Sequence, residues 1–325
     1  MMRRTESRYF GCAAAVLVAL SRLTVAAAAA PAVEVTKDDT HVTVTAGKRL
    51  LMEYRYGGDP FKPYIRRWTT PTGVQVLRDS PHDHVHHHAL MFAVGAGGVD
   101  FWSEHKKCGR QVHRAFETAK AVQTAAGPGV TIVERLDWQA PDKTGVLTEK
   151  RTIRLDMSQP HGASLLTWQS ALTPAKPRKS VKLHGSHYFG LGMRFVVPMD
   201  KGGRFFNPTG KAGKTVRGTE RLVAAPWCAY TAKADGKVVT VAMFDHPGNA
   251  RRALWFTMTG HFAYLSATTN LWKQPAVLPA GGTLDLVYGA ALWDGLAKPD
   301  AVEKLYKHWL ASAPKPAPAP KQAVK

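Results

Sequence analysis

Alternation of apolar and polar residues runs through most of the chain. It is clearest at 33–36 and 41–45, which flank a turn at 37–40, and at 129–138 and 147–155 in the middle of the sequence. Successive side chains of a strand point to opposite faces, so this pattern predicts β-strands that bury one face. By the same pattern, or as short apolar runs between turn residues, further strands are predicted at 49–55, 63–70, 89–94, 164–172, 238–244, 262–266 and 283–292.

One segment, 299–310, has the pattern of a helix. It begins with Pro299 and Asp300, and its apolar residues recur near the i, i+3, i+4 and i+7 spacing of a helix face. Many strands without a βαβ rhythm predict an all-β fold, a large antiparallel β-sandwich of two sheets with one C-terminal helix. We assign 31–311 to this single domain and expect the Pro/Ala/Lys-rich tail at 312–325 to be disordered.

The first 30 residues have the features of a secretory signal peptide. Arg3 and Arg4 precede an apolar run at 11–20, and the alanines at 26–30 form a small-residue cleavage zone. We therefore expect cleavage near Ala30 and a periplasmic or extracellular location. No later segment approaches the roughly 20 apolar residues of a transmembrane helix, so no transmembrane span is expected.

Charge and cysteine content bear on partners and cross-links. Lys and Arg number 44 against 24 Asp and Glu, and removal of residues 1–30 leaves a net charge of 40 − 23 = +17. Such a charge attracts polyanions, anionic glycans or a membrane surface. The basic residues are scattered along the sequence without a nucleic-acid motif, so we expect no nucleic-acid ligand.

Cys108 and Cys228 remain after cleavage. Two interpretations stay open for them, a disulfide and two buried free thiols.

A cluster of histidines at 82–88 is the first candidate for chemistry. Five of the fourteen histidines of the chain lie in these seven residues. Each imidazole needs partners for two ring nitrogens, so histidines seldom cluster for packing alone. If the segment is extended, His84, His86 and His88 share one face, where they could ligate a transition metal.

Known metal-site spacings fit this cluster poorly. The order of its histidines resembles the H-x-H-x-D-H spacing of metallo-β-lactamases, but His86 occupies the place of the acid. A cupin site needs a glutamate a few residues later, where this chain has Ala89 and an apolar strand. We therefore expect no cofactor, with a bound metal as the lesser alternative. Two interpretations stay open beside it: a sugar or polyol site in which imidazoles hydrogen-bond and one acts as general acid or base, and an exposed basic loop without a role.

Two further segments contain candidate site residues. Asp245, His246 and Asn249 follow a predicted strand, at a place where a Pro-Gly pair turns the chain. Loops at strand ends often form binding sites, but Asp and Asn also hydrogen-bond their own backbone in such turns. Arg194 lies on an apolar strand, where it is either paired structurally or directed into a ligand cleft.

The order of several motifs resembles one known family. The motifs are Pro63-Tyr64, Pro71-Thr-Gly-Val-Gln-Val-Leu-Arg-Asp79, Asp83-His-Val-His-His87, Gly98-Val-Asp-Phe-Trp102, Gly190-Leu-Gly-Met-Arg194, Asp245-His-Pro-Gly-Asn249 and Leu278-Pro-Ala-Gly-Gly-Thr-Leu284. Together they are similar to the secreted bacterial β-proteins labelled PmoA-like, or "methane oxygenase PmoA". The label misleads, since methane monooxygenase subunits of that name are membrane-embedded. The resemblance implies a β-sandwich similar to the galactose-mutarotase-like supersandwich, and an association with carbohydrate catabolism.

This sequence departs from the PmoA-like pattern at several motif positions. Where the family commonly reads Asp-His-Pro-His-His-Arg-Gly-Leu, Val85, His88 and Ala89 stand in place of Pro, Arg and Gly. Gly248, Ala250, Arg252 and Ala253 differ from the second motif in the same way. The retained positions are Asp83, His84, His86, His87, Asp245, His246, Pro247 and Asn249.

These observations predict an exported carbohydrate-active protein that acts on a sugar or modified glycoside by acid–base chemistry, as an epimerase, a hydrolase or a lyase. The expected catalytic residues are His86 or His87 as base or acid, with Asp245 and His246 across the cleft as partner or orienter. The expected substrate-binding residues are Arg78, Asp83, His84, Trp102, Arg194 and Asn249, with Trp102 stacking on a sugar face. A non-catalytic sugar-binding module and a metalloprotein with the ligands His84, His86 and His88 are the alternatives.

Overall fold

The computed structural model describes residues 1, 32–124 and 127–318. The compact unit of the chain is Ala32–Lys325. Apart from Met1, the predicted signal peptide lies outside the described residues, and so does the end of the tail at 319–325.

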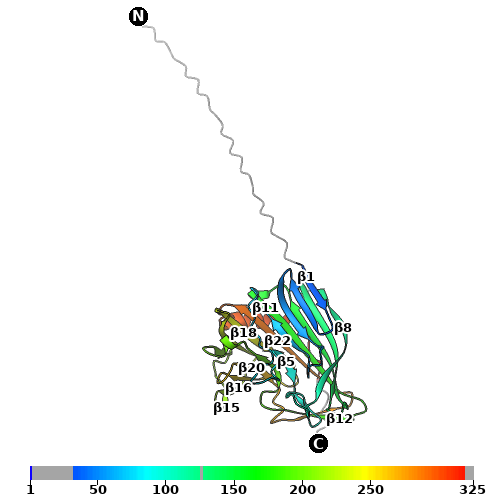
Figure 1. The fold of residues 1–325 in the computed structure, drawn as a ribbon. Coiled ribbons are helices and arrows are strands. Elements are labelled where there is room, and N and C mark those ends of the chain that lie inside the picture. The colour runs from blue at the N-terminus through cyan, green and yellow to red at the C-terminus, as the bar shows by residue number, and fades with distance from the viewer. Residues whose placement is uncertain (2–31, 125–126, 319–325) are drawn as a thin grey trace. The chain divides into compact units, whose positions relative to one another are not determined.

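The described residues form three antiparallel sheets, two large and one small (Figure 1). In spatial order, the ten-stranded sheet comprises β1 (Val33–Lys37), β2 (His41–Ala46), β3 (Arg49–Arg55), β4 (Tyr64–Trp68), β5 (Leu90–Ala93), β13 (Gly190–Arg194), β20 (Tyr264–Thr268), β19 (Leu254–Met258), β16 (Glu220–Ala224) and β15 (Lys214–Arg217). The eight-stranded sheet comprises β14 (Arg204–Phe206), β17 (Trp227–Ala234), β18 (Lys237–Asp245), β22 (Leu284–Asp294), β11 (Ala163–Pro174), β10 (Gly145–Asp156), β9 (Gly127–Gln139) and β8 (Arg110–Thr124). The small sheet comprises β21 (Ala276–Pro279), β12 (Ser180–His184), β6 (Gly95–Ala96) and β7 (Val99–Asp100). The helical elements are η1 (Pro160–Gly162), η2 (Val197–Met199) and α1 (Pro299–Ser312).

The two large sheets enclose one apolar core. Alternate residues of β22, such as Leu286 and Tyr288, belong to this core together with Trp68 and Phe92 of the ten-stranded sheet. Removal of this apolar surface from water is the main stabilising contribution to such a sandwich. At one edge of the sandwich, β1 adjoins β8.

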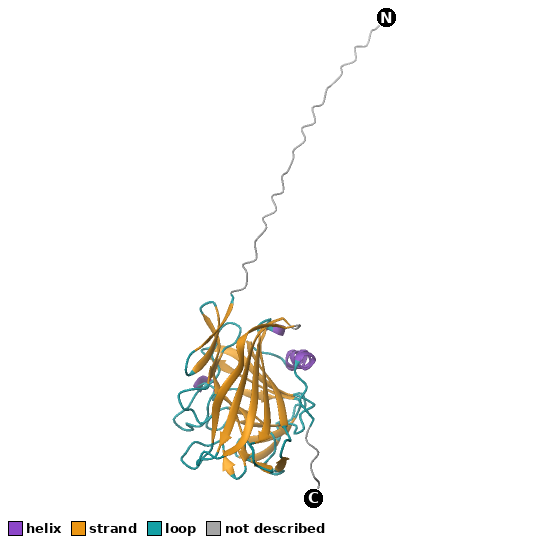
Figure 2. Ribbon diagram, turned by 90° about the vertical axis from the view of Figure 1, so that its right-hand side faces the viewer, coloured by secondary structure: helices purple, strands orange, loops and turns teal. Residues whose placement is uncertain are grey.

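Helix α1 covers the outer face of the eight-stranded sheet (Figure 2). Its residues Leu305 and Trp309 pack against Phe244 of β18 and Val287 of β22. Because side chains alternate along a strand, these residues face away from the main core, and β22 is buried on both faces. The indole N–H of Trp309 also donates to Thr167 of β11, at 2.9 Å.

The predicted antiparallel β-sandwich with one C-terminal helix is confirmed. The strand predicted at 49–55 coincides with β3, and the predicted helix begins with α1 at Pro299. The longest strand, β8, has no counterpart among the predicted strands. Its register shifts between His113 and Ala115 and again farther along, and these irregularities break the period-two pattern from which strands are recognised.

The start of the C-terminal tail lies against the sheet. Residues 313–318 are described, and the backbone N–H of Ala317 donates to Asp285 of β22 at 2.8 Å. This part of the segment expected to be disordered is therefore attached to the fold.

Of the two interpretations of the cysteines, the structure has the second: Cys108 and Cys228 are buried free thiols. In the described part of the chain, no helix is long and apolar enough to cross a membrane.

Candidate functional site

The histidine cluster lies in a closed loop that precedes β5. A backbone bridge between Asp79 and His88 closes its base. Inside the loop, the N–H of His84 donates to the carbonyl of Pro81 and the N–H of His87 donates to that of His84, both at 2.9 Å. The loop therefore consists of turns, and the extended conformation that we considered for this segment is wrong.

The turns bring three of the histidines to one cavity. His84, His86 and His87 line it together, and we call it the histidine cavity. The ring centroids of His84 and His86 each lie 4.7 Å from that of His87, which stacks on His84 at an interplanar angle of 23°. The volume of about 490 Å³ is in the range of small-molecule sites.

Aromatic rings form much of the rest of this cavity. Tyr188, Phe256, Phe262 and Tyr264 line it from the segments around β13, β19 and β20. The hydroxyl of Tyr264 is buried and has no hydrogen-bond partner among the described residues. Gly192 of β13 makes room for this ring, because a Cβ at that position would lie 2.0 Å from the Tyr264 hydroxyl. The cavity thus combines apolar faces with a few polar groups, as ligand sites commonly do.

A carboxylate faces the cavity from the first residue of β16. Glu220 is 5% exposed and lines the cavity beside Arg217. Arg217 donates to one carboxylate oxygen at 2.6 Å, and Nε2 of His187 lies 3.0 Å from the other. These two partners hold the carboxylate in one orientation.

Burial keeps two of the cavity histidines neutral. Desolvation, aided by the charge of Lys62, lowers the pKa of His86 to about 4. Stronger desolvation, aided by the charges of His86 and His84, lowers the pKa of His87 to about 2. At neutral pH both imidazoles are therefore uncharged and can accept hydrogen bonds, and His86 is the stronger base of the two.

The third cavity histidine is oriented by a carboxylate. Nδ1 of His84 lies 3.1 Å from Oδ2 of Asp83, and the same oxygen accepts from Nη2 of Arg194 at 3.1 Å. Burial acts to raise the pKa of Asp83, but the hydrogen bond from His84 and the charge of Arg194 outweigh it, and this pKa is lowered. An ionised Asp83 only accepts, so Nδ1 of His84 is the donor of this hydrogen bond.

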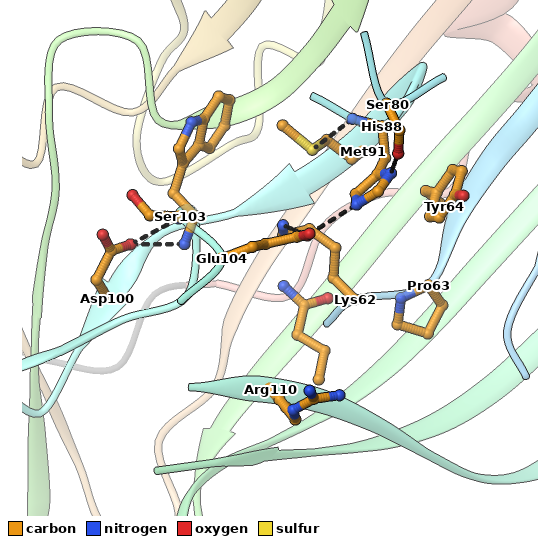
Figure 3. Close-up of polar contacts among 12 residues, drawn as sticks. Lys62, Pro63, Tyr64, Ser80, His88, Met91, Asp100, Ser103, Glu104 and Arg110 are labelled. Carbon is orange, nitrogen blue, oxygen red and sulfur yellow. Dashed lines mark hydrogen bonds and ion pairs between the residues drawn. The ribbon is translucent and has the colours of Figure 1, made fainter. Parts of the chain in front are cut away.

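His88 belongs to a separate polar network (Figure 3). Its Nε2 lies 2.8 Å from Glu104, which is also the partner of the fully buried Lys62, and its Nδ1 lies 2.9 Å from Asp79. Burial acts to lower the pKa of His88, but the hydrogen bonds to Asp79 and Glu104 outweigh it and raise this pKa. Tyr64 stacks on the imidazole at 4.3 Å and donates to Asp79. Acidic and basic side chains therefore alternate along this network, in the order Asp79, His88, Glu104 and Lys62.

The metal set that we considered is not brought together. His84 and His86 face the cavity, whereas both ring nitrogens of His88 are bonded to carboxylates of the other network. Within the residues described, no group of three His, Cys, Asp or Glu side chains could hold a metal ion. The donor set of the proposed ligands therefore does not fit a resident metal.

His88 and Ala89, at the end of the loop, are both set by their surroundings. The raised pKa of His88 favours a positive charge between Asp79 and Glu104. Ala89 has a φ of +44°, in the left-handed region that favours glycine.

Asp245, His246 and Asn249 do not face the histidine cavity, which corrects our expectation. Asp245 pairs with Arg252 and accepts a hydrogen bond from Asn249 at 2.8 Å. The amide of Asn249 also donates to and accepts from the backbone of Val287 in β22, both at 2.8 Å. His246 contacts α1 through Trp309, and burial lowers its pKa. These residues tie a turn to the eight-stranded sheet.

Two expected substrate-binding residues also occupy other places. Trp102 is fully buried and stacks on Phe189 at 4.9 Å, so its ring is not presented to a sugar. Arg78 lies beside the cavity-forming loop, where its Nη1 is 3.7 Å from Asp200. Arg194 lies under the loop, with its guanidinium 3.4 Å from the ring centroid of Phe262.

Sequence reasoning missed the side of the cavity that faces the histidines. Glu220, Arg217 and Tyr188 lie far from the histidine loop in sequence and carry no motif. A signal did exist for Phe262 and Tyr264, because their i, i+2 spacing in a predicted strand places both rings on one face. For Glu220 no such signal exists.

A family model matches residues 41–307, which is most of the chain. Its description is "Family of unknown function (DUF6807)". The chain belongs to DUF6807. A search of curated proteins found no match to this DUF6807 member.

Three solved structures resemble this DUF6807 protein at low identity. An alpha-galactosidase from Lactobacillus brevis has a TM-score of 0.47 and 7% identity over 81% of this chain and 39% of its own. A putative aldose 1-epimerase from Klebsiella pneumoniae has a TM-score of 0.43 and 11% identity over 85% of this chain and 81% of its own. A GH36 alpha-galactosidase from Geobacillus stearothermophilus, in complex with raffinose, has a TM-score of 0.42 and 12% identity over 81% of this chain and 41% of its own. The chain thus spans about two fifths of the two alpha-galactosidases.

Proposed function

We propose that this DUF6807 protein is an exported, carbohydrate-active protein that binds a sugar or modified glycoside in the histidine cavity and acts on it by acid–base chemistry. The observation that carries this proposal is the convergence of His84, His86 and His87 on a cavity that also contains Glu220. The cavity can enclose a ligand of sugar size, and its aromatic rings suit the apolar face of a pyranose.

The side chains divide into groups that move protons and groups that orient the ligand. His86 and His87 are neutral at physiological pH and accept hydrogen bonds from ligand hydroxyl groups, and His86, whose pKa is less depressed, is the better proton acceptor of the two. Asp83 orients His84 through a hydrogen bond at Nδ1. Asp83 therefore has the orienting role that we had expected for Asp245 and His246. Glu220, held by His187 and Arg217, accepts hydrogen bonds from ligand hydroxyl groups.

The proposal also includes the family subgroup of this protein and its export from the cell. Within DUF6807, the retained Asp83-His-Val-His-His87 motif favours membership of the secreted PmoA-like group. The basic, apolar and small-residue zones of residues 1–30 support export to the periplasm or the medium, with cleavage near Ala30.

Replacement of a cavity histidine tests this function. His86→Gln keeps a hydrogen-bonding side chain of similar reach but removes the base, so we expect turnover of a responsive glycoside to fall by about 10²–10⁴-fold. Sugar binding should change much less. Purified protein is assayed for binding by calorimetry and for turnover on a panel of glycosides and free aldoses.

His82→Gln is the matched control, because His82 lies exposed in the same loop and does not line the cavity. It should retain both binding and turnover. Wild-type binding without turnover on any substrate would identify a sugar-binding module instead of an enzyme. Equal losses in the His82 and His86 variants would rule out a specific role for the cavity.

A further inference from the structure

A second cavity lies on the opposite face of the strands that form the histidine cavity. Its volume is about 410 Å³, and it lies among β14, β16, β17 and β19. Along β16, Glu220 faces the histidine cavity and Arg221 the second one. Along β19, Phe256 and Thr257 alternate in the same way. Since side chains of a strand point alternately to its two faces, these strands separate the two cavities.

The second cavity is positively charged. Arg204, Lys211 and Arg221 line it, and none of its lining residues, all in the described part of the chain, is Asp or Glu. We call it the basic cavity. In the stretch 201–221 that forms most of it, six Lys and Arg stand against one acid, Glu220. This stretch has a net charge of 6 − 1 = +5, and three of its cations, Arg204, Lys211 and Arg221, line the basic cavity.

Its cationic groups are available to a ligand. Arg204 and Lys211 are exposed and form no ion pair with any described residue. Asn207 donates to the carbonyl of Lys211 at 2.8 Å and accepts from Thr209, so the loop that presents Lys211 is held by its own hydrogen bonds. Unpaired cations of one sign in a concave site attract an anion, and an ordered loop reduces the entropy cost of binding it.

We infer that the basic cavity binds the sulfate or carboxylate groups of an anionic glycan. Arginine forks match the geometry of both anions, and Thr257 and Thr259 add hydroxyl donors to the lining. Thr219 lines both cavities at the turn before β16, so one chain of sugars passing this turn reaches both. The carbohydrate nature of the ligand rests on the proposed function, whereas the anion site rests on the basic cavity itself.

The aromatic residues of the basic cavity argue against nucleic acid as the ligand. Single strands bind largely by stacking of bases on free aromatic faces. Here Phe205 stacks on Tyr230 at 4.2 Å and Phe206 packs edge-on against Trp227 at 5.9 Å. These rings are already used within the fold, and the cavity offers cations and hydroxyl groups instead.

Charge reversal at the two exposed cations tests the inference. The wild-type protein and the Arg204→Glu/Lys211→Glu variant are titrated calorimetrically with a chondroitin sulfate hexasaccharide, its unsulfated counterpart and neutral maltohexaose. We expect wild type to prefer the anionic hexasaccharides, and the variant to lose at least about tenfold in affinity for them because two attractive contacts become repulsive. The unsulfated probe separates sulfate recognition from carboxylate recognition. The Arg204→Gln/Lys211→Gln variant, which only neutralises charge, should show a smaller loss.

A matched double variant controls for net charge. Lys48 and Lys120 are exposed and lie toward the opposite edges of the two large sheets, so Lys48→Glu/Lys120→Glu makes the same change of charge away from the basic cavity. Equal loss in this control, no preference of wild type for anionic probes, or equal affinity for single-stranded DNA of the same charge would overturn the inference. The two proposals fail separately: His86→Gln should leave binding of the anionic probes intact, and the basic-cavity variants should still turn over a neutral substrate.

Discussion

Three neighbouring histidines show how environment sets the chemistry of one residue type. His86 and His87 are held neutral by burial, whereas hydrogen bonds to Asp79 and Glu104 raise the pKa of His88 and favour its charged form. The backbone turns decide which ring meets which environment. Residue identity alone therefore did not distinguish proton acceptors from a structural cation.

These pKa shifts predict the pH dependence of stability. Histidine in an unfolded chain has a pKa of about 6.5. The pKa values of about 4 for His86 and about 2 for His87 mean that, between pH 4 and 6.5, only the unfolded chain is protonated at both positions. Stability contributed by these residues is therefore lost as pH falls, and near pH 5 they contribute uptake of about two protons on unfolding. His88, with a raised pKa, acts oppositely and loses its contribution as pH rises above 6.5.

Urea denaturation at pH 4.5 to 8 measures this dependence. The contribution of the three histidines should be largest near pH 6.5, and His86→Gln should reduce proton uptake near pH 5 by about one. An unchanged slope in that variant would contradict the assignment of a neutral His86. The acidic partners Asp79 and Glu104, whose pKa values are lowered, add to the loss only at lower pH.

At the scale of elements, similar-looking loops have different roles. The loop closed by Asp79 and His88 presents imidazoles to a cavity. The turn after β18 instead uses Asn249 to complete the hydrogen bonding of Val287. Polar residues at strand ends thus line a cavity in one loop and attach chain segments to the sheet in the other.

Replacement of Asn249 separates these roles. Asn249→Ala leaves the buried amide and carbonyl of Val287 without side-chain partners, so we expect a loss of about 2–3 kcal/mol in the free energy of unfolding. Glycoside binding in the histidine cavity should not change. Urea denaturation and calorimetry measure the two quantities. Lost binding with unchanged stability would restore Asn249 as a ligand contact.

At the scale of the whole molecule, the sandwich places two unlike cavities on the two faces of one sheet edge. β16 and β19 supply an acid and an aromatic ring to one cavity, and an arginine and a threonine to the other. Basic residues that are dispersed over 201–221 in the sequence meet around the second cavity. Part of the high net charge of the chain is thereby located at one cavity.

A further prediction is that the protein is exported and cleaved near Ala30. Expressed with residues 1–30 in a Gram-negative host, the protein should be recovered from the periplasm or medium with a new N-terminus near Ala30. N-terminal sequencing and intact mass measure this directly. Deletion of the apolar run 11–20 should retain the unprocessed protein in the cells. Recovery of full-length protein from the cytoplasm with the intact signal would contradict the assignment.

Much of the fold was predictable because strand alternation is a local signal. β2 and β9 are recognisable by their period-two patterns, and α1 by its helical spacing. β8 was not predicted because its register shifts interrupt the period-two pattern. Local reading also placed the histidine cluster at a cavity but misjudged the conformation of its backbone.

By itself, the sequence predicted a β-sandwich with one terminal helix and indicated residues 82–88 as the first candidate for a site. Only the tertiary structure decided that Glu220 completes the histidine cavity, that Asp245 lies elsewhere, and that Arg204 and Arg221 share a second cavity. The physical reason is the distance along the sequence over which each feature is determined. Alternation and imidazole clustering depend on adjacent residues, whereas a cavity is assembled from strands that pair across long separations in the chain.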